Sequence, residues 1–271
     1  MHDDAQARAA ATYNAAADAY DDPANSFWDR FGRRTVERLG LPRSARVLDV
    51  CCGSGASALP AAEAVGADGN VLGVDLAPNL IEQAQRKAAG RSLRNVQFRV
   101  GDMLDLRLPE SSFDAVICVF GIFFVPDMAA AVRTLSRLVR PGGSIAITTW
   151  GPRFFAPVDA VFWRAVQTRR PDLQQLFRPW ERVSEPDLLR ALFSETGAAQ
   201  LDVVAEPGAH TLRSPEDWWP MVLGTGYRGT IEQMSDTDRA LVKRECLEFI
   251  GNSAVSSVEA NVIYAIATKE S

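Results

Sequence analysis

The chain has 271 residues, 47% of them hydrophobic and 23% charged, and a formal net charge of −5 at pH 7. This length and apolar content suffice for one large globular domain, or for a domain with a cap. The acidic balance disfavours nucleic-acid partners, because binding to a phosphate backbone draws on a basic face. No apolar run approaches a membrane span, and the N-terminus lacks the basic-then-apolar order of a signal peptide, so we expect a cytoplasmic protein without membrane partners.

Two helices are predicted before the first strand. Residues 5–20 are rich in alanine and end at Asp21-Asp22-Pro23, where proline prevents further helix. Residues 27–40 carry apolar side chains at helical spacing and end at Gly40, a residue suited to the turn after a helix.

From residue 45 to residue 150, strands and helices alternate, which is typical of a doubly wound, mostly parallel α/β sheet. We predict strands at 47–50, 71–75, 95–100, 113–120 and 144–150, and helices at 54–66, 78–89 and 127–140. Beyond them, a capping box at Ser184-Glu-Pro-Asp187 predicts a helix at 185–196. The remaining strand candidates are 201–205 and 261–268, with helices beginning near Ser214 and Ser235 between them.

The first strand leads into Cys51-Cys52-Gly53-Ser54-Gly55 and then an alanine-rich helix. The glycines allow a tight turn, and amide groups at a helix N-terminus can contact the polar tail and sugar of a ligand. Asp75 closes the second strand, where a carboxylate can accept hydrogen bonds from both hydroxyls of a ribose. These features predict a nucleoside-binding site, although a plain strand-to-helix turn would show the same glycines and dinucleotide enzymes share the acid.

Further motifs follow in a fixed order. The third strand ends in Gly101-Asp102-Met103, which puts a second acid where an adenine or its ribose would lie, and Arg140-Pro-Gly-Gly143 introduces the fifth strand. With these motifs the chain resembles the class I S-adenosylmethionine-dependent methyltransferases, in particular the ubiquinone/menaquinone methyltransferase-like small-molecule group. The resemblance covers about residues 10–205.

The resemblance implies a Rossmann-like, seven-stranded, mostly parallel sheet with an antiparallel last strand and helical cap insertions. It divides the chain into an N-terminal helical lid at 1–40, a core that binds S-adenosylmethionine at 41–150, a substrate cap at 151–184, and a completion of the sheet at 185–271 with a helical insertion at about 207–258.

The resemblance also implies where the cofactor lies. It gives Asp49, Gly53 and Gly55 to the methionine end, Asp75 to the ribose, and the end of the fourth strand to the sulfonium side. Cys51 stands where the family usually has its first glycine. The full set of expected cofactor-binding residues is Tyr20, Arg33, Asp49, Cys51, Gly53, Ser54, Gly55, Asp75, Leu76, Gly101, Asp102, Met103, Val119 and Phe120. For Arg33 the alternative is a solvated position on a packed helix, and for Cys51 and Cys52 close packing is a better explanation than nucleophilic catalysis.

The acceptor side is predicted to be apolar or aromatic. Expected substrate contacts are Phe123, Phe124, Trp163, Trp180 and Tyr227, with packing inside the cap as the alternative. No catalytic residue is assigned, and His210, Asp127 and Glu181 are the candidates for a general base. His2 and His210 are the only histidines, and the four cysteines show no metal or disulfide spacing, so we expect no metal.

We therefore predict transfer of a methyl group from S-adenosylmethionine to an O, N or C atom of a small, apolar or aromatic metabolite by in-line displacement. Two alternatives stay open. One is an NAD(P)-dependent oxidoreductase, which would normally have a third glycine at the position of Ala58, and the other is a non-catalytic nucleoside-binding protein of the same fold.

Overall fold

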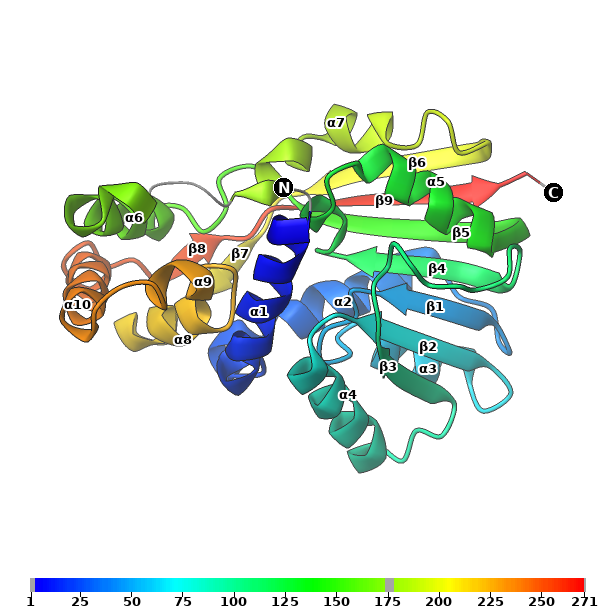
Figure 1. Ribbon diagram of the computed structural model, residues 1–271, viewed down its shortest axis with the longest axis horizontal. Coiled ribbons are helices and arrows are strands. Elements are labelled where there is room, and N and C mark those ends of the chain that lie inside the picture. Colours follow the sequence, from blue (N-terminus) through cyan, green and yellow to red (C-terminus); the bar gives the residue numbers. More distant parts are fainter. Residues whose placement is uncertain (1–2, 174–177, 271) are drawn as a thin grey trace.

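The computed structural model describes residues 3–173 and 178–270. Within them, a seven-stranded sheet has the order β3-β2-β1-β4-β5-β9-β6 (Figure 1). Its strands are β1 (Arg46–Val50), β2 (Asn70–Asp75), β3 (Val96–Val100), β4 (Phe113–Val119), β5 (Val139–Trp150), β6 (Ala198–Glu206) and β9 (Val262–Lys269). β9 runs antiparallel to β5 and β6, and the other neighbouring strands pair in parallel. The predicted fold is confirmed.

Helices cover both faces of this sheet, because its central strands are apolar on both sides. In β4, Ala115 and Ile117 join one buried cluster, while Val116 and Cys118 join the other. The helices that follow the strands are α3 (Ala58–Val65), α4 (Pro78–Gly90), α5 (Met128–Leu138) and α7 (Pro186–Ala191). Before the sheet come α1 (Asp3–Tyr20), the short helix η1 (Pro23–Asn25) and α2 (Phe27–Leu39).

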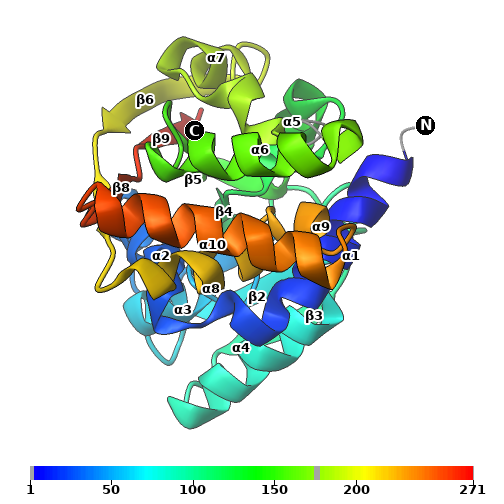
Figure 2. The ribbon, with the colours of Figure 1, turned by 90° about the vertical axis from the view of Figure 1, so that its left-hand side faces the viewer.

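A helical cap lies beyond the carboxyl ends of the parallel strands. It contains α6 (Val158–Arg169), α8 (Trp218–Leu223), α9 (Arg228–Ile231), α10 (Asp236–Asn252) and the pair β7 (Ala209–Thr211) with β8 (Ser257–Glu259). α10 packs along α6 (Figure 2). Short helical turns η2 (Ile122–Phe124), η3 (Pro171–Leu173), η4 (Pro179–Val183) and η5 (Pro215–Asp217) connect these elements.

Three predicted helix boundaries differ from the structure. The helix after the glycine loop begins at Ala58 rather than at residue 54, because Gly53 and Gly55 have φ angles of 52° and 91° that no α-helix contains. The capping box at 184–187 is wrong: Glu185 takes the N-cap position of α7 without a side-chain bond, and that helix stops at Ala191. Ser235 is confirmed as an N-cap, since its hydroxyl accepts the backbone N–H of Asp238 at 3.1 Å.

Among the described helices, none combines the length and the hydrophobicity that crossing a bilayer would require.

Candidate cofactor pocket

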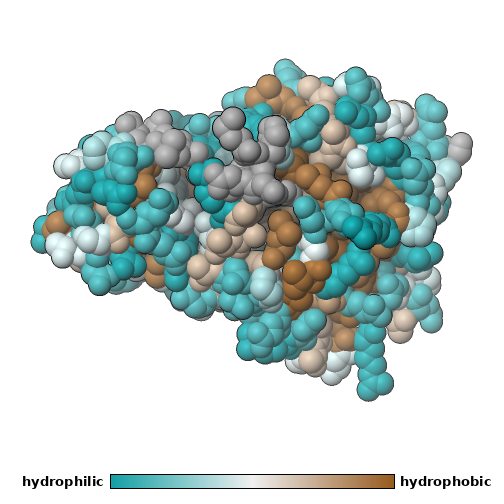
Figure 3. Space-filling view, in the orientation of Figure 1, coloured by the Kyte–Doolittle hydropathy of each residue, from teal (hydrophilic) through white to brown (hydrophobic). Residues whose placement is uncertain are grey.

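A cavity opens where β1, β2 and β4 end, beneath α1. It holds about 690 Å³ of empty space, its open mouth included, which falls within the roughly 300–1,000 Å³ usual for small-molecule sites. Hydrophobic residues gather on the face between α1 and the strands (Figure 3). Val100 and Leu104, both about half exposed at 53% and 44%, flank the segment that contributes Gly101 and Met103 to the cavity wall.

The cavity collects most of the predicted cofactor and substrate residues that lie near the strand ends. Those in its wall are Tyr20, Cys51, Gly53, Asp75, Leu76, Gly101, Met103, Val119, Phe120 and Phe124. They converge because the carboxyl ends of parallel strands meet at one edge of a sheet.

Asp75 presents a carboxylate to this cavity from the end of β2. Its Oδ2 accepts the N–H of Gly53 at 2.9 Å, and its Oδ1 accepts the N–H of Ala77 at 2.9 Å. Burial raises the pKa of Asp75, and the hydrogen bonds from the Ala77 and Gly53 amides act in the opposite direction. Because each carboxylate oxygen can accept a further hydrogen bond, the residue can still bind two hydroxyl groups.

The turn after β1 holds Cys51 in a left-handed conformation, with φ of 55°. This explains why a glycine is usual at that position in the resembling family, since a non-glycine residue there costs about 1–3 kcal/mol. Phe120, at the end of β4, also has a positive φ of 54°. Gly121 makes room for the thiol: a Cβ on Gly121 would lie 2.4 Å from the Cβ of Cys51. Both strained residues line the cavity, which is where strain of this kind tends to concentrate.

Aromatic side chains from α1 and α2 close the cavity, and sequence reasoning missed two of them. Trp28 stacks on Tyr20 with ring centroids 5.1 Å apart, and Tyr13 meets Tyr20 and Phe124 edge-on at 6.3 Å and 5.5 Å. Tyr13 and Tyr20 are seven residues apart, so they share one face of α1. That spacing could have identified Tyr13. Ala9, Ala10, Leu80 and Val125 complete the wall.

Several predicted cofactor residues do not line the cavity. Asp49 is fully buried beneath the loop, where its Oδ2 accepts the Ser57 hydroxyl at 2.7 Å. Among the described residues its Oδ1 has no hydrogen-bond partner, and burial raises the pKa of Asp49 to about 7. A side chain at Gly55 would meet Leu59, at 3.0 Å, rather than a ligand. These residues shape the loop from below.

Three further residues predicted to bind the cofactor have other partners. The Ser54 hydroxyl donates to Asp21 at 2.6 Å. Asp102 accepts the backbone N–H of Leu104 at 2.8 Å, so its carboxylate stabilises the local turn. Arg33 is about half exposed and lies 3.8 Å from Glu63, which agrees with the alternative of a solvated arginine.

Most of the predicted substrate-binding rings pack inside the protein. Phe123, Trp163, Trp180 and Tyr227 are at most 6% exposed and lie outside the cavity wall. The Tyr227 hydroxyl donates to Asp159 at 2.5 Å. The cap therefore uses these rings as its own core, which was the alternative, and Phe124 is the predicted substrate residue that reaches the cavity.

The three candidates for a general base also lie outside the wall. His210 is buried on β7, where its Nε2 lies 2.8 Å from the carbonyl oxygen of Ala24, and burial lowers its pKa. Asp127 caps α5 by accepting the N–H of Ala130 at 2.9 Å. Glu181 is exposed and pairs with Arg178 at 2.7 Å.

Comparison with known proteins identifies the family. A methyltransferase domain model matches residues 47–143. Over 192 residues the chain is 34% identical to aklanonic acid methyltransferase DauC of Streptomyces sp. (strain C5), covering 66% of this chain and 87% of that protein. It is also 36% identical over 121 residues to a demethylmenaquinone methyltransferase of Geobacillus kaustophilus, covering 44% of this chain and about half of that relative, 52%.

Solved structures share the fold. The YcgJ protein of Bacillus subtilis superposes with a TM-score of 0.60 at 22% identity, over 89% of this chain and 99% of that chain. The [4+2]-cyclase SpnF gives a TM-score of 0.55 at 19% identity, over 89% and 80%. The chain thus belongs to the S-adenosylmethionine-dependent methyltransferases. It uses S-adenosylmethionine as its cofactor and acts on a small molecule.

The residues of the cavity fit this cofactor. Gly53 has a positive φ of 52° and no side chain, which leaves backbone accessible at the turn, and a Cβ there would lie 2.9 Å from the Tyr20 hydroxyl. Asp75 has free acceptor capacity facing the cavity. Together they provide a close backbone approach and a carboxylate, the two groups that a nucleoside with a polar tail requires.

Proposed function

We propose that the cavity binds S-adenosylmethionine with Asp75 holding the ribose hydroxyls, the turn at 51–53 holding the methionine end, and Gly101 and Met103 beside the adenine. The observation that carries this assignment is the Asp75 carboxylate, which lies in the cavity wall and is fixed there by the Gly53 amide. Residues 1–40 would act as a lid over a core at 41–150, with segments 151–184 and 207–258 forming the acceptor cap.

We further propose that the acceptor is apolar or aromatic. The part of the wall near the end of β4 consists of Val119, Phe120, Phe124 and Val125, and Tyr13 and Trp28 face it from the helices before the sheet. Such rings bind a flat molecule through stacking and burial of apolar surface. The names of the relatives support a small-molecule acceptor, in one case a quinone and in another aklanonic acid.

When bound, S-adenosylmethionine supplies a methyl group activated by its sulfonium. The protein's part is to position the acceptor atom and exclude water, which can contribute about 7–11 kcal/mol to lowering a barrier. Cys51 and Cys52 are not suited to nucleophilic catalysis, because burial raises the pKa of Cys52 and, with a hydrogen bond to Cys118, that of Cys51.

The wall also bears on the choice of acceptor atom. Among the described residues that line it, Asp75 is the sole carboxylate and there is no histidine or lysine. Burial raises the pKa of Tyr20, so its hydroxyl stays protonated. With no base beside the acceptor, the best suited substrates are those whose nucleophile ionises readily, such as an acidic phenol or an enol. We therefore favour O- or C-methylation.

Calorimetry with S-adenosylhomocysteine tests the cofactor assignment. Asp75→Asn removes a charged acceptor worth roughly 1.5–3 kcal/mol, so the Kd should rise about 10- to 150-fold. Asp202→Asn changes an exposed carboxylate on β6 and serves as the matched control. An Asp75→Asn protein that folds and binds like the wild type would remove Asp75 from the site.

Thermal melts with S-adenosylhomocysteine, NAD and NADP test the proposed ligand against the oxidoreductase alternative. Stabilisation by the first ligand alone is expected, since a ligand that binds the native state raises the midpoint. For the acceptor, transfer of a labelled methyl group to quinols, phenols and enolic acids should be followed with the wild type and Phe124→Ala. We expect the variant to raise KM for the acceptor and to leave the Kd of S-adenosylhomocysteine unchanged.

A further inference from the structure

A three-residue cluster joins the end of α1 to the glycine loop. Asp21 directly follows α1, and its Oδ1 accepts the Ser54 hydroxyl at 2.6 Å. Lys87 on α4 donates to the same oxygen at 2.9 Å and to the Ser54 Oγ at 3.1 Å. We call Asp21, Ser54 and Lys87 the loop cluster. It connects three elements that are far apart in the sequence.

The loop cluster is well placed to hold the loop. Ser54 is fully buried, and its hydroxyl uses its donor on Asp21 and an acceptor site on Lys87. The side chain of Lys87 is 23% exposed and that of Asp21 36%. Hydrogen bonds to partly buried charged groups are stronger than those between neutral groups. Without Asp21, the buried hydroxyl and the Lys87 ammonium would both lose their charged partner.

The loop needs such support because glycines flank Ser54 on both sides. Gly53 and Gly55 have positive φ angles, and glycine restricts the backbone least. The N–H of Gly53 donates to Asp75, so the position of the loop also sets one hydrogen bond of that carboxylate. Tyr20, the residue before Asp21, has its hydroxyl where a Cβ of Gly53 would be crowded, at 2.9 Å. Tyr20 and Asp21 therefore hold Gly53 and Ser54 from the α1 side.

We propose that Asp21 and Lys87 are positioning residues for S-adenosylmethionine, which act through Ser54 to couple docking of α1 to the geometry of Gly53 and Asp75. This inference rests on the cofactor placement proposed above. Ser54, expected from the family to touch the cofactor, has this indirect role instead. Because coupling between two sites is reciprocal, cofactor binding should also favour the docked position of α1.

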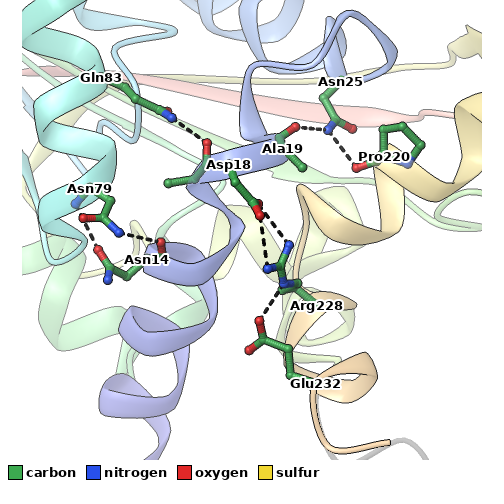
Figure 4. A network of polar contacts seen from close by, with 10 residues as sticks. Asn14, Asp18, Ala19, Asn25, Asn79, Gln83, Pro220, Arg228 and Glu232 are labelled. Carbon is green, nitrogen blue, oxygen red and sulfur yellow. Dashed lines mark hydrogen bonds and ion pairs between the residues drawn. The ribbon is translucent and has the colours of Figure 1, made fainter. Parts of the chain in front are cut away.

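Other contacts of α1 provide the control. Its remaining length is fixed by hydrogen bonds of Asn14 and the Ala17 carbonyl to α4, and by an ion pair between Asp18 and Arg228 of α9, at 3.0 Å (Figure 4). Figure 4 shows these contacts on both sides of the helix. None of those residues belongs to the loop cluster, and Asp18→Asn weakens the docking of α1 without altering it.

The experiment measures the Kd of S-adenosylhomocysteine by calorimetry for Asp21→Asn, Lys87→Met, Ser54→Ala and Asp18→Asn. For the first three we expect about tenfold weaker binding, within the roughly 5- to 150-fold range usual for coupled sites. The double variant Asp21→Asn/Lys87→Met should bind about as weakly as either single variant, because both changes break the same cluster. Asp18→Asn should stay within about twofold of the wild type.

Hydrogen exchange on the same proteins separates positioning from stability. In Asp21→Asn and Lys87→Met, amides at 53–57 should lose protection, whereas in Asp18→Asn they should keep it. Equal loss of affinity in Asp18→Asn and Asp21→Asn would overturn the proposal, because docking of α1 in general would then explain both. So would a lower unfolding midpoint with unchanged affinity in Asp21→Asn and Lys87→Met. Failure of the cofactor placement itself would be recognised separately, since Asp75→Asn would then bind normally.

Discussion

The most informative single substitution is Asp49→Asn. Asp49 is fully buried beneath the glycine loop, where its Oδ2 accepts the Ser57 hydroxyl and its Oδ1 lacks a partner among the described residues. Burial, reinforced by the nearby charge of Asp75, raises the pKa of Asp49 to about 7, although the bond from Ser57 opposes the shift. Asparagine preserves the shape and the oxygen that faces Ser57, and it cannot ionise.

The pH dependence has a definite sign. In the unfolded chain an aspartate has a pKa of about 3.9, so between about pH 4 and pH 7 the native state holds a proton that the unfolded state has lost. The contribution of Asp49 to stability is therefore fully present below about pH 4 and is lost as the pH rises through about 7. At about 1.4 kcal/mol per pH unit over about three units, the loss is on the order of 4 kcal/mol.

Urea unfolding without cofactor, followed by circular dichroism at pH 5, 6, 7 and 8, measures this loss. The wild-type free energy of unfolding should fall relative to that of Asp49→Asn as the pH rises, with most of the difference gained by pH 7. Asp202→Asn, on the exposed side of β6, should follow the wild type. Parallel curves for the wild type and Asp49→Asn from pH 5 to pH 8 would show that the buried carboxyl is not protonated in the native protein, and the reasoning from burial would be refuted.

Three further outcomes are expected. Gly55→Ala, at a φ of 91° and with Leu59 3.0 Å from the added Cβ, should cost about 1–3 kcal/mol and lower the melting midpoint by several degrees; an unchanged midpoint would contradict this. His210→Ala removes the contact with the Ala24 carbonyl, so the midpoint should fall while kcat stays within about tenfold, and excess EDTA should leave kcat unchanged; a loss of 10²–10⁴-fold would instead indicate a general base. Residues 10–40 and 151–184 should exchange amide hydrogens more slowly with S-adenosylhomocysteine than without it, and equal protection would indicate a preformed open pocket.

The parts of the site that depend on strand ends could be predicted from the sequence. Asp75 closes β2, and Gly53 follows β1, so a parallel sheet brings both to one edge whatever the rest of the chain does. The direction of Asp49 follows from the same rule, applied one step further. Asp49 is two residues from Val47 on β1, and Val47 packs in the cluster that contains Leu59 and Ala62 of α3. The side chain of Asp49 therefore points to the α3 face.

The parts that depend on packing between distant segments could not be predicted. Whether Trp28 or Trp163 reaches the cavity is decided by how α2 and α6 dock, and composition treats the two rings alike. Trp28 stacks on Tyr20 above the cavity, whereas Trp163 packs against Tyr227 in the cap. Lys87 is similar: its helix was predicted, but its contact with Asp21 spans 66 residues of sequence and requires the folded chain.

The two ends of the cavity recognise their ligands by different physics, and this separates cofactor specificity from acceptor specificity. The cofactor end depends on a carboxylate and backbone amides held by hydrogen bonds of fixed direction, so a small shift of Asp75 or Gly53 is costly. The acceptor end depends on Phe124, Val125 and Tyr13, whose contacts are apolar and less directional. Substitutions there should change which small molecules are methylated by modest factors while cofactor affinity stays constant. Divergence in acceptor among relatives with one conserved cofactor chemistry is the behaviour that such a division of the cavity allows.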